Sequence, residues 1–307
     1  MKGFIFLFLG GLAILAFLTP SDFVWTLKLH EQYLNLWPHF ASFMKRSFFE
    51  GEWPGGSDVG ILFGVAVLAA YFRAIRKQAL SSRWRPAIGY LTFVVLTTPV
   101  IIHSLKLIAN RPRPHFYPPF FPWYDVTSFF WSFEVAKSSF PSGHVASAVI
   151  PLSLAYVLFR HLPSWKSRLA VVLFSVAILL HTGFMGIARA MTWDHWLTDS
   201  FSAAMIVILH LHASYYWILK VEEQEQMSSF LAKVQQFKRF WELKLVAFCL
   251  ISSLALVTGT LILRGFWDVP PFLREGGFLV FLLIFGFGLW CFARERAVFF
   301  KKCYEQE

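Results

Sequence analysis

The sequence LAVVLFSVAILLHTGFMGIA, residues 169–188, is followed directly by RAMTWDHWLTDS at 189–200, and together they are the best guide to the fold. About 20 residues of helix cross the hydrocarbon core of a bilayer, so the first part predicts a transmembrane helix. Arg189 ends this span, and His195 and Asp199 stand where the next apolar run begins. Ionisable residues between two spans mark a membrane face at which chemistry can occur.

Seven further runs extend the same pattern along the chain. Of the 307 residues 57% are hydrophobic and only 15% are charged, whereas a soluble domain carries about a quarter charged residues. We therefore predict an all-α polytopic membrane protein. The other expected spans are Phe4–Leu18, Val59–Phe72, Pro86–Leu105, Val145–Phe159, Trp196–Leu219, Leu245–Leu263 and Phe278–Ala293.

The net charge of +10 is spread over short basic clusters between the apolar runs. This distribution is typical of loops that flank membrane spans, and it argues against nucleic acid as a partner. The three cysteines, Cys249, Cys291 and Cys303, have no metal-ligand spacing. We expect neither a zinc site nor a disulfide framework.

The distribution of basic residues also predicts the orientation. With the N-terminus inside, 18 of the 28 Lys and Arg residues fall in cytoplasmic segments, so both termini are expected in the cytoplasm. The first run could be a cleaved signal peptide, since Lys2 precedes an apolar segment, but a retained anchor is favoured because no small-residue cleavage site follows it. We predict a six-span core over 1–220 with interfacial helices within 19–58, a cytoplasmic linker over 221–244, and two additional spans with a short cytoplasmic tail over 245–307.

Three groups of polar residues lie at the ends of spans three to six. Lys106 closes the third span and Arg113 follows it, and the turn PSGH at 141–144 begins the fourth. Arg189 closes the fifth span, and His195 with Asp199 begins the sixth. Because successive spans alternate in direction, all three groups are expected at the same non-cytoplasmic face.

These residue types suit phosphoryl chemistry. Lys106, Arg113 and Arg189 can neutralise a phosphate and the charge of its transition state. Ser142 and Gly143 begin a helix, where backbone N–H groups favour an anion. Interfacial anchoring is the alternative for any single cation, and a metal site at His144, His195 and Asp199 is disfavoured by the three neighbouring cations.

The two histidines can divide the chemistry between them. His195 and Asp199 are four residues apart and share a helix face if the helix has started there. The carboxylate can then fix the imidazole tautomer that leaves the other nitrogen free to attack phosphorus. His144 can protonate the leaving oxygen and later activate water. For Arg111 a supporting role and a headgroup contact stay open.

The three groups resemble the motifs of the type 2 phosphatidic acid phosphatase superfamily. The first motif, Lys, six residues, Arg-Pro, matches Lys106 to Pro114, and the second, Pro-Ser-Gly-His, matches 141–144. The third, Ser-Arg, five residues, His, three residues, Asp, matches Arg189, His195 and Asp199, but Ala188 replaces the serine. One hydrogen bond, worth on the order of 0.5–1.5 kcal/mol, is lost there.

The resemblance implies a six-helix lipid-phosphatase core, a phosphohistidine at His195, acid catalysis by His144, and no metal or other cofactor. The expected function is hydrolysis of a phosphate or diphosphate monoester on a membrane lipid, at the periplasmic face of a bacterial inner membrane. Phosphatidic acid, phosphatidylglycerol phosphate, an isoprenoid diphosphate and lipid A all remain candidate substrates. The alternatives are a lipid phosphotransferase and a non-catalytic protein that binds or translocates phospholipid. The oligomeric state is left open.

Overall fold

The computed structural model describes residues 2–35, 37–48, 51–77, 84–109, 111, 113–114, 139–162 and 164–222. Every regular element in these ranges is a helix, which confirms the all-α class for this part of the chain. The predicted spans Leu245–Leu263 and Phe278–Ala293 lie outside the described residues, as does the predicted linker beyond residue 222.

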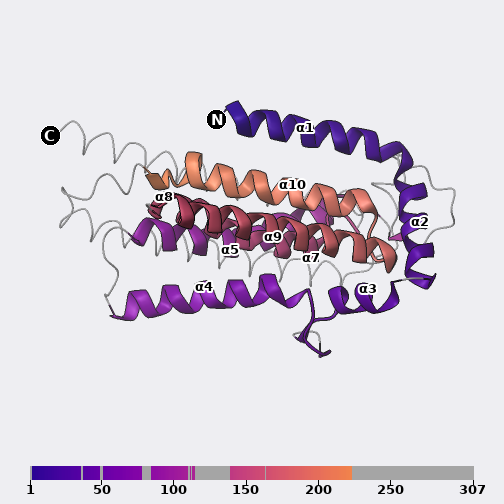
Figure 1. Cartoon of the computed structure of the whole chain (residues 1–307), viewed down its shortest axis with the longest axis horizontal. Helices are drawn as coiled ribbons and strands as arrows, with labels where there is room; N and C mark the ends of the chain where they lie inside the picture. Colours follow the sequence, from indigo (N-terminus) through magenta and orange to yellow (C-terminus); the bar gives the residue numbers. More distant parts are fainter. Residues whose placement is uncertain are drawn as a thin grey trace, which may run out of the picture.

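Within the described residues, six helical rods run side by side along the long axis of the molecule (Figure 1). One of them is composite, because Pro151 lies in a 3₁₀ turn between α7 and α8. Another ends in a π-helical turn that prolongs α10. The rods are α1 (Lys2–Leu18), α4 (Asp58–Lys77), α5 (Arg85–Ala109), α7 (Gly143–Val149) with the turn Ile150–Leu152 and α8 (Ser153–His161), α9 (Trp165–Met191), and α10 (Leu197–Ala213) with Ser214–Ile218.

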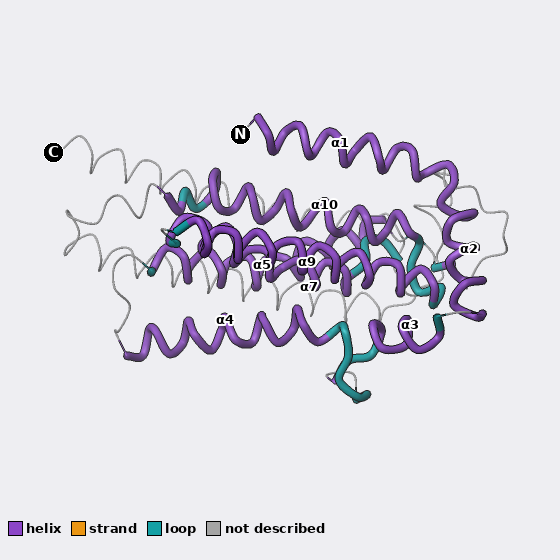
Figure 2. The backbone as a smooth tube through the Cα atoms, viewed as in Figure 1, coloured by secondary structure: helices purple, strands orange, loops and turns teal. Residues whose placement is uncertain are grey.

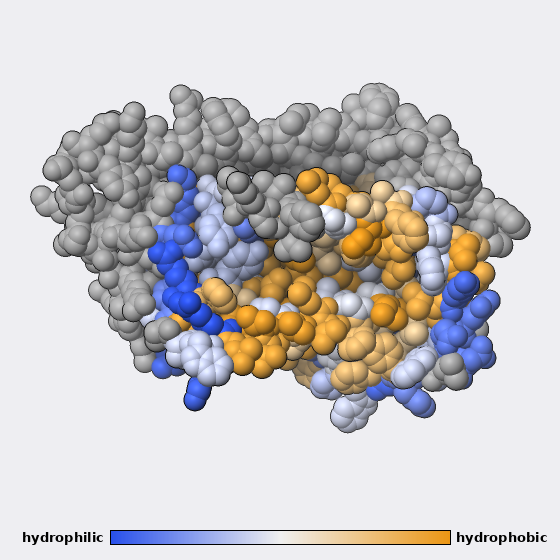
Figure 3. Space-filling view, turned by 45° about the horizontal axis from the view of Figure 1, so that its top comes forward, coloured by the Kyte–Doolittle hydropathy of each residue, from blue (hydrophilic) through white to orange (hydrophobic). Residues whose placement is uncertain are grey.

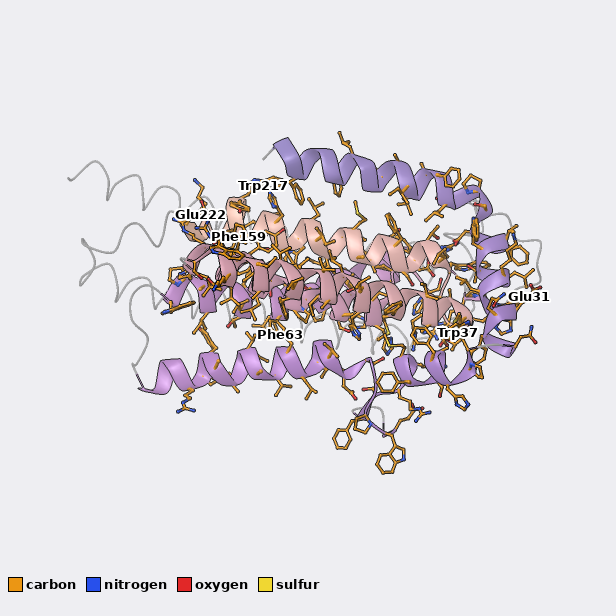
Figure 4. The ribbon with its side chains drawn as sticks, viewed as in Figure 1. Glu31, Trp37, Phe63, Phe159, Trp217 and Glu222 are labelled. Carbon is orange, nitrogen blue, oxygen red and sulfur yellow. The ribbon has the colours of Figure 1, made fainter. Side chains whose placement is uncertain are left out.

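Two shorter helices close one end of this bundle. The turn Thr19–Ser21 leads from α1 into α2 (Asp22–Asn35), which runs across the end of the rods, and α3 (Pro38–Lys45) follows it (Figure 2). Both helices pack on α9, and α2 also contacts α10. In Figure 4 Glu31 and Trp37 mark this end, while Phe159, Trp217 and Glu222 mark the opposite one. Helices therefore occupy the segment 19–58 in which interfacial helices were expected.

Five helical stretches among the described residues are long and apolar enough to cross a membrane. The outer surface of α9 is apolar, with Leu173 61% and Leu180 56% exposed, as expected for side chains that face acyl chains. Figure 3 shows an apolar band between two more polar ends. The chain is therefore an integral membrane protein. The five stretches are Phe8–Tyr33, Pro86–Lys106, Gly143–His161, Trp165–Met191 and Leu197–Ile218.

The predicted second span, Val59–Phe72, lies within α4, which packs along α5 but is not among those five stretches. Its sequence includes Asp58 at the start and Arg73, Arg76 and Lys77 at the end, which lowers its mean hydropathy. The count of six core spans therefore stays a prediction.

Small residues bring the rods that carry the motifs close together. A Cβ atom on Gly186 of α9 would lie 3.0 Å from the Ser200 Cβ of α10 and 3.9 Å from a Val145 methyl of α7. A Cβ on Gly60 of α4 would overlap the backbone of Ser147 in α7. These two glycines therefore let α4 approach α7, and let α9 approach α7 and α10, without crowding by a side chain.

Candidate active site

The structure brings the eight predicted site residues to one end of the bundle, beside α2 and α3. Lys106 is in the last turn of α5, and Arg113 follows that helix. Ser142 precedes α7, whose first residues are Gly143 and His144. Arg189 is in the last turn of α9, and Asp199 is in the first turn of α10 with His195 just before it. The three sequence-distant groups therefore converge as expected.

Three cations and a buried hydroxyl form the part of the site suited to an anion. Lys106 is an electrostatic neighbour of both Arg113 and Arg189, and a Cβ on Gly143 would lie 4.0 Å from its Cε. Arg189 is only 4% exposed. The Ser142 hydroxyl is buried and has no hydrogen-bond partner among the residues that the structure describes. A phosphate oxygen would supply that partner and balance the cations.

His195 is positioned by its backbone and lies close to Asp199. Its Nδ1 lies 3.7 Å from Asp199 Oδ2, and both side chains are buried. The helix begins only at Leu197, so the condition under which His195 and Asp199 would share a helix face is not met. Instead, the backbone N–H groups of Asp194 and His195 both donate to the Arg189 carbonyl oxygen, at 3.1 and 3.2 Å. Trp193, with a φ of 56°, makes the turn that allows this.

The surroundings keep the His195 imidazole neutral. Burial lowers the pKa of His195 from 6.5 to about 4, and the charges of Arg189 and Lys106 act in the same direction while Asp199 opposes them. The ring is therefore neutral near pH 7, which is the form with a lone pair available for attack. His144 is an electrostatic neighbour of His195, Arg189 and Lys106, so the two histidines lie near each other and near the same cations.

Asp194 is a site residue that sequence reasoning missed. Its carboxylate lies 3.0 Å from Lys45, 3.6 Å from Arg113 and 3.8 Å from Arg189, and it accepts a hydrogen bond from the Thr192 hydroxyl at 2.7 Å. Burial acts to raise the pKa of Asp194, but Arg189, Thr192 and Lys45 outweigh it and lower that pKa to about 2. Its position directly before His195 was the signal available in the sequence.

Arg111 and Asp22 form a second group behind Asp199. Arg111 Nη1 donates to Asp199 Oδ1 at 2.6 Å, and Nη2 donates to Asp22 Oδ2 at 3.0 Å. Arg111 is 4% exposed and Asp22 is 2% exposed. Of the two roles left open for Arg111, this geometry favours support over a headgroup contact. No pattern in the sequence pointed to Asp22, which comes from α2.

Ala188, where the family motif has serine, is fully buried in the last turn of α9. Its carbonyl oxygen accepts the Thr192 N–H at 3.0 Å, so the backbone of the turn is intact. The substitution removes a hydroxyl next to Arg189 and leaves every group of the proposed chemistry in place.

The family model of the PAP2 superfamily matches residues 87–223. These residues form a PAP2 superfamily domain. Over 133 residues the chain is also 35% identical to "Lipid phosphate phosphatase 1" of Arabidopsis thaliana. This match covers 38% of the present chain and 39% of the relative. The chain thus matches well under half of the relative's length. No solved structure matches the chain at a significant level.

The PAP2 domain contains all eight predicted site residues, from Lys106 to Asp199. Asp22 and Lys45 lie before it, on α2 and α3. Two of the groups that contact the site in this structure are therefore supplied by the chain outside the PAP2 domain.

Proposed function

We propose that this protein is a membrane phosphatase that hydrolyses a phosphate or diphosphate monoester of a lipid. The observation that carries the proposal is a buried, neutral His195 beside Asp199, facing three cations at one end of a bundle of apolar helices. The PAP2 domain supports it, and so does the similarity to a lipid phosphate phosphatase of Arabidopsis thaliana. The lipid is the natural substrate because the site lies at the end of helices with an apolar outer surface.

In the first step the Nε2 lone pair of His195 attacks phosphorus, and the bond from phosphorus to the lipid oxygen breaks. His144 gives its proton to that oxygen, so the lipid leaves as an alcohol or as a monophosphate. Negative charge on the bound phosphate favours the protonated form of His144 beforehand. Lys106, Arg113 and Arg189 stabilise the charge on the equatorial oxygens. The phosphorylated imidazole carries a positive charge, which Asp199 balances.

In the second step His144 takes a proton from water as the water oxygen attacks phosphorus. The bond between phosphorus and Nε2 breaks, phosphate leaves, and His195 recovers its lone pair. His144 is again protonated, and the cycle closes without any other proton donor. His195 thus accepts the phosphoryl group and then releases it, and His144 donates a proton and then regains one.

The topology belongs to the same proposal. Both termini lie in the cytoplasm and the site faces the periplasm or a lumen, with a six-span core over 1–220, a linker over 221–244 and two additional spans over 245–307. Basic residues crowd the segments assigned to the cytoplasm, in agreement with the positive-inside rule.

The test measures phosphate release from a panel of lipid phosphates and diphosphates by detergent-purified protein, with EDTA present. We expect release by the wild type and by His161→Ala, a control at the opposite end of the bundle, and none by His195→Ala. Acid-labile, alkali-stable radioactivity on the protein after brief exposure to labelled substrate would identify the phosphohistidine. Release that His195→Ala leaves intact would refute the mechanism. Product that appears only with an added lipid alcohol would instead establish a phosphotransferase.

A folded wild type that releases nothing from any lipid would refute the phosphatase. A non-catalytic protein that binds or translocates phospholipid would then be the remaining hypothesis, and lipid movement between the leaflets of reconstituted vesicles would test it.

A further inference from the structure

The start of α10, which carries Asp199, is completed by side chains of α2. The first N–H groups of a helix have no partner within it. Here the Leu197 N–H donates to the Thr26 hydroxyl oxygen at 3.2 Å, and the Thr198 N–H donates to Asp22 Oδ1 at 3.1 Å. The Thr198 hydroxyl also donates to Asp22 Oδ2. Asp22 and Thr198 are 176 residues apart, so a helix that is distant in the sequence caps α10, the helix that carries Asp199.

Arg111 joins the two aspartates from the other side. One of its nitrogens, Nη1, contacts both Asp199 Oδ1 and the Thr198 hydroxyl oxygen, at 2.6 and 2.9 Å, while Nη2 contacts Asp22. Its guanidinium lies over the Trp196 ring, 5.0 Å from the centroid. The planar fork of arginine is suited to holding two carboxylates in a fixed relation. The second Asp199 oxygen, Oδ2, accepts the Trp196 N–H at 3.0 Å and faces His195.

The charges of this cluster explain why two acids are needed. Arg111 and Asp199 alone would neutralise each other. No net negative charge would then remain to stabilise the imidazolium that forms when His195 is phosphorylated. With Asp22 the three side chains carry one net negative charge. In a buried site, where water screens little, that charge is worth far more than at a surface. Asp22 therefore supplies the counter-charge for Arg111 and leaves Asp199 to stabilise His195.

We propose that Asp22 and Arg111 are positioning residues that hold Asp199 against His195 and keep one negative charge available to it. This inference rests on the proposed phosphatase function. It implies that α2, which precedes the PAP2 domain, contributes Asp22 to the function of the site. Neither residue touches the phosphate: both act through Asp199.

The test compares Asp22→Asn and Arg111→Lys with Asp58→Asn. Asp58 is a matched control, because it is also a buried acid with three strong hydrogen bonds, accepted from the Ser47 hydroxyl and from the N–H groups of Phe48 and Gly55. We expect Asp22→Asn to lower kcat by on the order of 10- to 100-fold, the range found when outer partners of metal-bound histidines are removed. Its KM and its inhibition constant for vanadate, a phosphate analogue, should stay within about threefold of wild type, because the cations remain. Asp58→Asn should lower the thermal midpoint but leave kcat within about twofold.

A double-mutant cycle separates positioning from general structural support. In an Asp199→Ala background, Asp22→Asn should cost less than about twofold in kcat, since the residue through which it acts is gone. An unchanged kcat in Asp22→Asn, or a loss that persists in the Asp199→Ala background, would overturn the proposal. If Asp22→Asn does not fold, Arg111→Lys takes its place in the cycle, with the same expected result and the same outcome that would overturn the proposal.

The proposed function can fail separately. If wild type hydrolyses no lipid phosphate, the proposed phosphatase function is refuted. The double-mutant cycle of Asp22→Asn and Asp199→Ala is then measured by thermal midpoints in detergent. Additive losses from Asp22→Asn and Asp199→Ala would then overturn the positioning pair as well, whereas coupled losses would support it.

Discussion

Lys45 Nζ lies 3.0 Å from Asp194 Oδ2, so α3 is tied to the residue that directly precedes the proposed nucleophile. The same carboxylate contacts Arg113 and Arg189. Asp194 therefore gives Arg113 and Arg189 the kind of negative partner that a bound phosphate would also give them.

The first prediction concerns Asp194→Asn. Because the carboxylate competes with phosphate for Arg113 and Arg189, its removal should lower the inhibition constant of orthophosphate by roughly three- to tenfold, which corresponds to about 1 kcal/mol. Competitive inhibition of lipid hydrolysis measures this constant. Glu222→Gln, which breaks the ion pair with Arg160 at the other end of the bundle, is the control. Weaker inhibition by phosphate would mean that Asp194 instead orders the cations for binding.

The second prediction concerns the stability of the protein in acid. The pKa of His195 is about 4 in the folded protein and about 6.5 when unfolded, so between these values the unfolded state binds more protons. Protonation of His195 should therefore cost wild type up to about 3 kcal/mol of stability as the pH falls from 6.5 to 4, and His195→Gln, which keeps every other titrating group, should lose that much less than wild type. The pKa of Asp194 is lowered to about 2, so its effect on stability appears only below about pH 4, outside the range from pH 6.5 to 4. Unfolding in detergent at pH 7 and pH 4.5 tests the difference, and equal losses in both proteins would contradict it.

The third prediction uses two glycines of α9. Gly186→Val should destabilise the protein by about 1–3 kcal/mol and reduce activity, because the new side chain would separate α9 from Ser200 of α10. Gly183, one turn earlier, has no atom within 4 Å of the place that a Cβ would occupy, so Gly183→Ala should keep both stability and activity. Thermal midpoints and kcat of the two variants give the comparison. Similar behaviour of both would show that the close contact at Gly186 is dispensable.

The fourth prediction concerns Ala188. Ala188→Ser restores one hydroxyl beside Arg189, and a hydrogen bond worth on the order of 0.5–1.5 kcal/mol would raise kcat/KM by about two- to tenfold. The measurement is kcat/KM for the best lipid substrate. Ala190→Ser, at a site that is equally buried but not in the motif, provides the control. A fall in kcat/KM would show that the buried turn has no room for the extra atom.

The sequence was sufficient to predict the groups that come from spans three to six, because alternation of direction alone brings Lys106, His144 and Arg189 to one face. It could not predict Asp22 or Lys45, since the docking of α2 and α3 on the bundle depends on packing that no motif or period records. The spacing of His195 and Asp199 suggested a shared helix face, but the helix begins at Leu197 and a turn brings the pair together instead. The expected spans after residue 222 lie beyond the described part of the chain.

The shared carbonyl of Arg189 has a mechanical consequence. Because the N–H groups of Asp194 and His195 both donate to that oxygen, the proposed nucleophile His195 and the proposed phosphate-binding residue Arg189 belong to the same turn of backbone. If α9 tilts to match a thicker or thinner bilayer, the two groups travel together and the distance between them is preserved. The relation between His195 and Arg189 is therefore set by local backbone hydrogen bonds and does not depend on how α9 is inclined in the bilayer.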